Sequence, residues 1–321
     1  MLGRGVAEHL AEVPPEEVWS SELRELCLSC ELVICNLECC ISEGGEPTRR
    51  IPGKPFFFRA PPVATESLRA IGVAAVGLAN NHALDFETEA LLDTLELLER
   101  SGIEATGAGT DPEAARRGVI VERAGTRIGL LAVSDHPREY AAGDDEPGIA
   151  CADLTRGLPS WLTAELGRLR EQADQVIAFP HWGPNMNPQT AGWQRRAAAE
   201  MIEAGATLLA GHSAHVFHGA GWVGESPLLF DLGDALDDYA VDSRLRNDIG
   251  VLALWRPGSA DEPLELVGLR LHYCRTDLAY GHDAEWIATR LGDACPRLGS
   301  SVERVAEQRF RVTRPSGSAA R

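Results

Sequence analysis

The chain has 321 residues, of which 44% are hydrophobic and 24% are charged. This composition provides enough apolar surface for a full core and excludes a disordered, collagen-like or coiled-coil chain. Its 30 basic and 48 acidic residues give a formal net charge of -18, which argues against nucleic acids and anionic membrane surfaces as partners. The only lysine, Lys54, lies in Gly-Lys-Pro, which excludes the phosphate-binding loop of P-loop NTPases.

Two further features bear on location. No apolar run reaches about 18 residues, so we expect no segment that spans a bilayer, and the first residues carry no signal-peptide hydrophobic region. The eight cysteines are unevenly spaced and crowd toward the start of the chain. We expect reduced, mostly buried thiols, because Cys27-Leu-Ser-Cys30 has no second pair with which to form a zinc site. The sequence as given therefore predicts a cytoplasmic protein.

Helical and extended segments alternate along the chain, which predicts an α/β layered fold with one main domain. The predicted helices span residues 16–29, 63–71, 87–100, 158–172, 191–204, 283–292 and 300–308. The predicted strands span residues 31–35, 73–79, 118–122, 127–134, 175–180, 206–210, 228–231, 249–255 and 264–273. Residues 314–321 are expected to form a frayed tail.

Four of these strands end in side chains that can bind metals or carry out catalysis. They run into Asn36-Leu37-Glu38, Asn80-Asn81-His82, Pro180-His181-Trp182-Gly183 and Gly211-His212-Ser213-Ala214-His215. Sheets of α/β proteins place their sites just beyond the carboxyl ends of the strands. If the strands are neighbours, six side chains converge on one crevice: Glu38, Asn81, His82, His181, His212 and His215.

These residue types make a mixed nitrogen and oxygen ligand set, which suits Zn, Mn or Fe better than Ca or a thiolate centre. Six candidates exceed one tetrahedral shell, whereas two metals about 3.5–4 Å apart would use them all. Such a pair polarises a phosphoryl or carbonyl oxygen and provides hydroxide near neutral pH. No Gly-x-Ser-x-Gly motif is present, so serine catalysis has no support.

The strings Leu78-Ala79-Asn80-Asn81-His82-Ala83-Leu84-Asp85, His181-Trp182-Gly183 and Gly211-His212-x-x-His215 resemble the CapA (poly-γ-glutamate capsule biosynthesis) family of the calcineurin-like metallophosphoesterase superfamily. Asn36-Leu37-Glu38, Phe58-Arg59-Ala60-Pro61 and Thr106-Gly107-Ala108-Gly109 follow in the family's order. The resemblance covers residues 1–275 and leaves 276–321 as a helical extension and tail. It implies a metallophosphatase-like α/β sandwich of mixed β-sheets flanked by helices, with two divalent transition metals.

The resemblance also implies roles for individual residues. Glu38 matches the bridging carboxylate, and Asn81 matches the metal-binding amide. His82 matches the catalytic histidine, which Asp85 would orient. The remaining metal ligands are implied to be His181, His212 and His215.

Two positions depart from the family pattern. The family opens with a strand that ends in Gly-Asp, followed by Met-Leu-Gly-Arg, and here Met1-Leu2-Gly3-Arg4 matches only the second part. We therefore expect the family's Asp ligand and first strand to lie upstream of Met1; the alternative is that this chain lacks them. A preceding segment would make the protein membrane-associated or exported. Leu232-Gly233-Asp234 stands where the family usually has Leu-Gly-Asn, and we expect this loop to lie close to the site.

Three further side chains are candidate substrate contacts. Lys54 and Arg59 flank an aromatic run and would supply positive charge to an anionic substrate; the alternative is core packing with one surface charge. His136 also follows a strand and is either a substrate contact or a turn histidine.

The leading hypothesis is a dinuclear-metal hydrolase linked to poly-γ-glutamate or capsule biosynthesis, in which metal-bound hydroxide attacks a phosphoester or a γ-glutamyl amide. The alternative is a non-catalytic accessory that binds an anionic polymer during its synthesis or export. The substrate would be an anionic small molecule or polymer. The choice of metal and the oligomeric state remain open.

Overall fold

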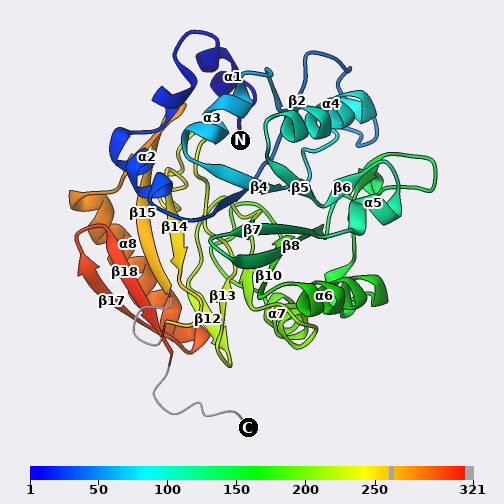
Figure 1. Ribbon diagram of the computed structural model, residues 1–321. Coiled ribbons are helices and arrows are strands. Elements are labelled where there is room, and N and C mark those ends of the chain that lie inside the picture. Colours follow the sequence, from blue (N-terminus) through cyan, green and yellow to red (C-terminus); the bar gives the residue numbers. More distant parts are fainter. Residues whose placement is uncertain (260–263, 315–321) are drawn as a thin grey trace.

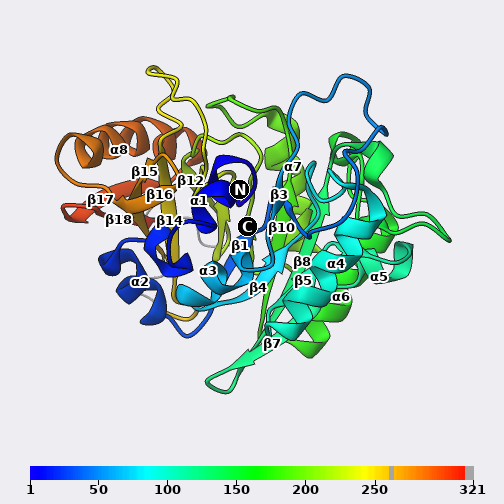
Figure 2. The same cartoon turned by 90° about the horizontal axis from the view of Figure 1, so that it is seen from above.

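The computed structural model describes residues 1–259 and 264–314. Three main β-sheets are flanked by helices, which confirms the predicted α/β sandwich of mixed sheets (Figure 1). Figure 2 shows the third sheet with α8 on one side of the molecule and α4, α5 and α6 on the opposite side. None of the helices in the described part of the chain is long and apolar enough to cross a membrane.

The strands fall into three sheets and two short ladders. The first sheet is parallel and has the order β1 (Val33–Asn36), β4 (Val73–Gly77) and β5 (Glu104–Thr106). The second sheet has the order β12 (Ala220–Val223), β13 (Ser226–Leu229), β11 (Leu208–Ala210), β10 (Gln175–His181), β8 (Thr126–Ser134) and β7 (Val119–Arg123). The third sheet is antiparallel, with the order β14 (Ile249–Trp255), β15 (Leu264–His272), β18 (Arg309–Thr313) and β17 (Ser301–Ala306), and with β16 (Arg275–Leu278) also paired to β15. The ladders are β2 (Cys40–Ile41) with β3 (Arg59–Ala60) and β6 (Ala108–Gly109) with β9 (Gly148–Ile149).

The helices cover the outer faces of these sheets. They are α1 (Gly5–Leu10), α2 (Ser21–Leu28), α3 (Ala64–Ala70), α4 (Glu87–Arg100), α5 (Pro112–Arg116), α6 (Ser160–Gln172), α7 (Gly192–Glu203) and α8 (Gly281–Ala294). Short 3-10 helices are η1 (Pro15–Val18), η2 (Arg138–Tyr140), η3 (Leu154–Arg156) and η4 (Cys295–Leu298). In α4, Leu91 and Leu98 lie on one buried face seven residues apart, as the helical period requires.

Two hydrophobic clusters account for the layering. One lies between the six-stranded sheet and helices α6 and α7, and the other joins the first, second and third sheets. The first two sheets approach each other closely at Gly77, where an added Cβ would lie 2.6 Å from the Phe179 ring. A glycine at this point lets β4 pack directly against β10. The strand ends of the two sheets are thereby brought together.

The predicted elements are confirmed over most of the chain. The correction concerns residues 300–308, which we expect to be helical but which form strand β17. Pairing of β17 with β18 overrides the local helical preference of this segment. Residues 16–29 are also divided, into η1 and α2, because Ser20 caps α2 by accepting a hydrogen bond from the Leu23 amide.

The C-terminal segment is only partly helical. Its helix α8 confirms the prediction for 283–292, and β18 joins the third sheet beside β15. The domain boundary at residues 275–276 stays a prediction. The expected tail at 314–321 lies, apart from Arg314, outside the described residues. All eight cysteines are free thiols, as expected.

Candidate metal centre

The four strand ends that carry the candidate ligands lie in two different sheets. Strands β1 and β4 are parallel neighbours in the first sheet, and β10 and β11 are parallel neighbours in the second. The four strands were expected to be neighbours; they are neighbours within each pair, but the two pairs lie in different sheets. Because the two sheets pack face to face at Gly77 and Phe179, both pairs of strand ends open toward the same region.

His181 and His212 form the buried centre of this region. His181 is 0% exposed, and its Nδ1 atom lies 2.8 Å from Nδ1 of His212, so one ring donates a hydrogen bond to the other. Burial, reinforced by His212 and by His136, lowers the pKa of His181 well below its usual value. Burial also lowers the pKa of His212 to about 3. Both rings are therefore neutral near pH 7, the state in which an imidazole binds a metal.

His215 has different surroundings, because carboxylates flank it on both sides. Its Nδ1 atom lies 2.9 Å from Asp234 Oδ1, and its Nε2 atom lies 3.9 Å from Glu38 Oε1. Although burial lowers the pKa of His215, Asp234 and then Glu38 outweigh it and raise this pKa to about 10. Without a metal, His215 is thus a buried cation that joins Glu38 of one sheet to the 232–234 loop of the other.

The backbone around His215 is strained. Ser213 has φ 124° and His215 has φ 57°, although neither is a glycine. Left-handed backbone at such residues costs free energy and is concentrated at functional sites. The chain is also closely packed just before this segment, where a Cβ at Gly211 would lie 2.5 Å from the Phe230 carbonyl oxygen and 2.6 Å from Trp182 Nε1.

The polar atoms that lack partners test whether a metal fits here. Buried side-chain atoms without a hydrogen bond include one from each of four predicted ligands: Glu38 Oε1, Asn81 Oδ1, His181 Nε2 and His212 Nε2. Leaving a buried acceptor unpaired costs about 1–3 kcal/mol, so unpaired atoms in this number indicate a missing partner. The donor set therefore fits a divalent transition metal by residue type.

The same side chains are not yet arranged as a metal site. Within residues 1–259 and 264–314, no three His, Cys, Asp or Glu side chains are placed so that they could hold a metal ion as they stand. The hydrogen bond between His181 and His212 uses nitrogen atoms that would otherwise be free. Side-chain rotation of these two rings would have to accompany metal binding.

His82 is hydrogen-bonded to a buried carboxylate that has several other partners. Its Nδ1 atom lies 2.6 Å from Oδ2 of Asp85, which is 0% exposed. Asp85 also accepts hydrogen bonds from the Phe58 amide at 2.7 Å and from the Tyr140 hydroxyl at 3.3 Å, and it pairs with Lys54 Nζ at 3.1 Å. The orientation of His82 by Asp85 is thus present in the structure, and His82 Nε2 remains available for another group.

The predicted substrate contacts differ in their surroundings. Lys54 is used within the protein, because Nζ contacts Asp85 and also donates to the Asn81 carbonyl oxygen at 2.7 Å. Arg59 donates to the carbonyl oxygens of Gly44 and Gly45, and its guanidinium lies 4.2 Å from the Phe86 ring centroid. Contact of either residue with a substrate stays a prediction.

His136 lies close to the histidines. Its ring centroid is 5.2 Å from that of His181, and its Nδ1 atom is hydrogen-bonded to Asp135. Asp135 in turn accepts a hydrogen bond from the Gly183 amide. His136 therefore borders the candidate centre, and its contact with a substrate stays a prediction.

Three side chains near the centre escaped the sequence analysis. Asp231 accepts hydrogen bonds from the amides of Ala214 and Gly233, and burial raises its pKa to about 7. The partly buried Asp135 is hydrogen-bonded to His136, and the Tyr140 hydroxyl donates to Asp85. Asp135 and Asp231 each follow the end of a strand, and this position could have identified them as candidates from the sequence.

Comparisons with known proteins identify a family and several relatives. The sequence model of a family described as "Bacterial capsule synthesis protein PGA_cap" matches residues 1–239. A probable polyglutamine synthesis accessory protein of Mycobacterium tuberculosis is 30% identical over 89% of this chain and 75% of its own length. The PGA biosynthesis protein CapA of Bacillus subtilis is 26% identical over 53% of this chain and 44% of its own length.

Among solved structures, a hypothetical protein from Thermus thermophilus is similar over 79% of this chain and 88% of its own, with 18% identity and a TM-score of 0.42. That similarity carries no argument about the site.

Proposed function

The chain belongs to the bacterial capsule synthesis protein family PGA_cap, and we propose that it is a metal-dependent hydrolase of this family. In this proposal two divalent transition metals, Zn, Mn or Fe, are held by five side chains: Glu38, Asn81, His181, His212 and His215. The bond that is cut is a phosphoester or a γ-glutamyl amide.

One observation carries the proposal: the buried, unpartnered atoms of predicted ligands gather at the strand ends of two facing sheets. Packing alone gives no reason to bury Glu38 Oε1, His181 Nε2 and His212 Nε2 without partners, since each loses its hydrogen bonds to water. A metal bound by these atoms would supply the missing partner.

When bound, two such metals polarise a phosphoryl or carbonyl oxygen and lower the pKa of water. The protein's own groups perform the rest. His82 is held by Asp85 through Nδ1, so its Nε2 atom can carry the proton that the leaving group needs. Asp234 holds His215 through Nδ1, which leaves Nε2 directed to the Glu38 side.

Lys54 acts in this mechanism through Asp85. Its ammonium and the Phe58 amide hold the carboxylate in place, so the carboxylate in turn fixes the His82 ring. Lys54 is thus a positioning residue in the proposal, in addition to any contact with substrate.

The test is hydrolysis of bis(p-nitrophenyl) phosphate and of poly-γ-glutamate by the chain loaded with Zn, Mn or Fe. We expect His82→Ala to lower kcat by about 100-fold or more, because general acid catalysis contributes about 100- to 10,000-fold. The matched control is His282→Ala, which removes an exposed histidine at the start of α8 and should leave the rate unchanged.

One result would contradict the proposal. If the loaded chain hydrolyses neither substrate faster than His82→Ala does, the hydrolase assignment is wrong. Binding of the polymer without cleavage would then favour the alternative, a non-catalytic accessory of anionic-polymer synthesis; the Mycobacterium tuberculosis relative is named a probable polyglutamine synthesis accessory protein.

A further inference from the structure

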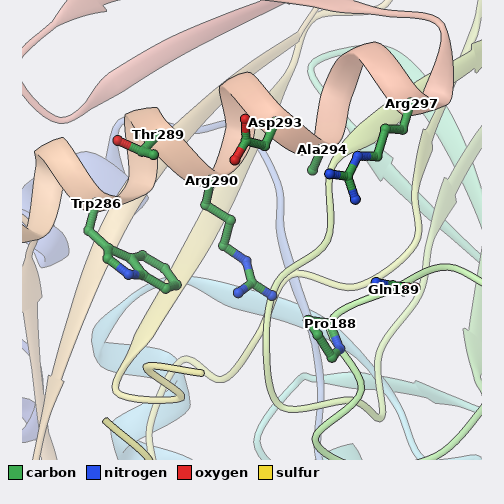
Figure 3. Close-up of a pocket in the computed structure, with 8 residues that line it drawn as sticks. All are labelled: Pro188, Gln189, Trp286, Thr289, Arg290, Asp293, Ala294 and Arg297. Atoms are coloured by element: carbon green, nitrogen blue, oxygen red, sulfur yellow. The ribbon is translucent and has the colours of Figure 1, made fainter. Parts of the chain in front are cut away.

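A cavity of about 330 Å3 lies between helix α8 and the loop that follows β10 (Figure 3). We call it the α8 pocket. The residues that line it include Pro188 and Gln189 from the loop, and Trp286, Arg290, Asp293 and Arg297 from α8 and η4. Figure 3 shows the Arg290 guanidinium projecting from α8 toward Pro188, with Trp286 to one side of it and Arg297 to the other.

The two guanidinium groups of this pocket form no salt bridge in the described part of the chain. Asp293 lines the same pocket, and the buried carboxyl of Asp231 also acts on Arg290. Arg290 Nε donates to the Phe217 carbonyl oxygen at 2.9 Å, whereas its Nη2 atom is buried without a partner. In a chain of net charge -18, two unpaired guanidinium groups in one cavity stand out as a site for an anion.

The guanidinium of Arg290 is held rigidly. It lies 4.9 Å from the Phe217 ring centroid and 5.2 Å from that of Trp286, so two aromatic faces fix its plane. Burial lowers the pKa of Arg290, which reflects the cost of keeping this cation away from water. A preorganised guanidinium loses little conformational entropy when it binds an oxyanion.

We propose that the α8 pocket binds one carboxylate group of an acidic chain, received by Arg290 and Arg297 with the chain's methylene groups against Trp286. Asp293 in the pocket and Asp231 beside Arg290 offset the two guanidinium groups, which leaves at most one positive charge and complements a carboxylate rather than a phosphate dianion. The volume fits one residue-sized unit, since ligand pockets span about 300–1,000 Å3.

The pocket is connected to the histidine centre through two chain segments. Pro188 and Gln189 belong to the loop that follows His181, and Phe217 lies two residues after His215. His218 joins the two segments, because its Nε2 atom lies 2.8 Å from the Asn187 carbonyl oxygen. Resting on the proposed hydrolase function, we infer that this pocket holds a carboxylate of one unit of the substrate, separate from the unit at the histidines.

The experiment is calorimetric titration of the full, metal-free chain with a short γ-linked oligoglutamate. We expect Arg297→Gln to weaken binding about tenfold, which corresponds to about 1.4 kcal/mol, because one charge-assisted hydrogen bond is lost. Arg290→Lys keeps the charge but removes the planar fork, and we expect a similar loss. Arg100→Gln is the matched control, because Arg100 pairs with Glu96 on the surface of α4 and should bind as the unmodified chain does.

Additional titrations show where the oligoglutamate binds and which chemical group is recognised. His181→Ala should retain binding, and a loss in that variant would place the ligand at the histidines and overturn the proposal. Inorganic phosphate should compete less well than glutarate, and the reverse order would overturn the carboxylate assignment. Equal binding by Arg297→Gln, Arg290→Lys and the unmodified chain would also overturn it.

Failure of the hydrolase proposal has a different signature. In that case the unmodified chain would bind the oligoglutamate with the same dependence on Arg290 and Arg297, and yet would cleave nothing when loaded with metal. Because Arg297 is exposed, Arg297→Gln should fold normally, and its melting temperature verifies this.

Discussion

The two halves of the candidate centre differ in how their buried polar atoms are satisfied. On the side of the first sheet, Asp85 is surrounded by four groups of the protein, from Lys54, Phe58, His82 and Tyr140. On the side of the second sheet, His181 and His212 contact each other and keep an unpaired Nε2 atom each. The Asp85 network is complete within the protein, and we call it the complete half. The second, unpartnered half comprises His181 and His212 together with Glu38 Oε1 and Asn81 Oδ1 at the strand ends of the first sheet.

This difference separates structural from ligand-dependent stability. A complete buried network contributes to folding and is costly to break at any single member. An incomplete set of acceptors costs free energy on folding and regains it when a ligand binds. Variants in the complete half should therefore change the stability of the metal-free chain, whereas variants in the unpartnered half should change its response to metal.

The largest effect is expected in the complete half. Asp85→Asn leaves the Lys54 ammonium, whose side chain is 8% exposed, without its counter-ion. We expect the free energy of unfolding in urea to fall by about 4 kcal/mol, as for other broken buried ion pairs. Asp153→Asn, at an exposed site in η3, is the control. A loss as small as that of the control would mean that this half does not stabilise the fold.

The second half should respond to metal instead. At a metal concentration of about one hundred times Kd, we expect the unmodified chain to gain about 2.7 kcal/mol of stability. His181→Ala should gain nothing, and His282→Ala should gain as much as the unmodified chain. Thermal unfolding with and without Zn or Mn measures this. Equal stabilisation of all three chains would show that the metal binds elsewhere.

Acid should also act on the second half. Burial lowers the pKa of His218 to about 4, so the unfolded chain binds this proton more tightly than the folded chain does. Stability is therefore lost as the pH falls from about 6.5 toward 4, with about 2 kcal/mol lost between pH 7 and pH 5. His218→Gln should remove that part of the loss in urea titrations at the two pH values. An unchanged pH dependence would contradict the neutral, buried state of His218.

Much of the fold could be predicted from local patterns. Buried strands such as β4 and β10 and the amphipathic helix α4 carry strong periodicities, and their polar termini indicated the candidate ligands. Strand β17 could not be predicted in this way, because its residues are mostly exposed and its pairing with β18 decides its conformation.

The sequence could predict which residue types form the site, but it could not predict which side chains contact one another. The 232–234 loop was expected close to the site, and Asp234 indeed contacts His215. That Lys54 would pair with Asp85, or that Tyr140 would reach the same carboxylate, depends on packing between distant segments. The division of the four strands between two sheets is likewise a property of the whole fold.

The central claim is that the unpartnered half binds divalent transition metals. The most direct measurement is the metal content of the purified, metal-loaded chain by elemental mass spectrometry, with His181→Ala and His212→Ala beside His282→Ala. We predict close to two ions per chain in the unmodified protein and in His282→Ala, and a loss of metal in the other two variants. A folded chain that retains no Zn, Mn or Fe after loading would contradict the claim.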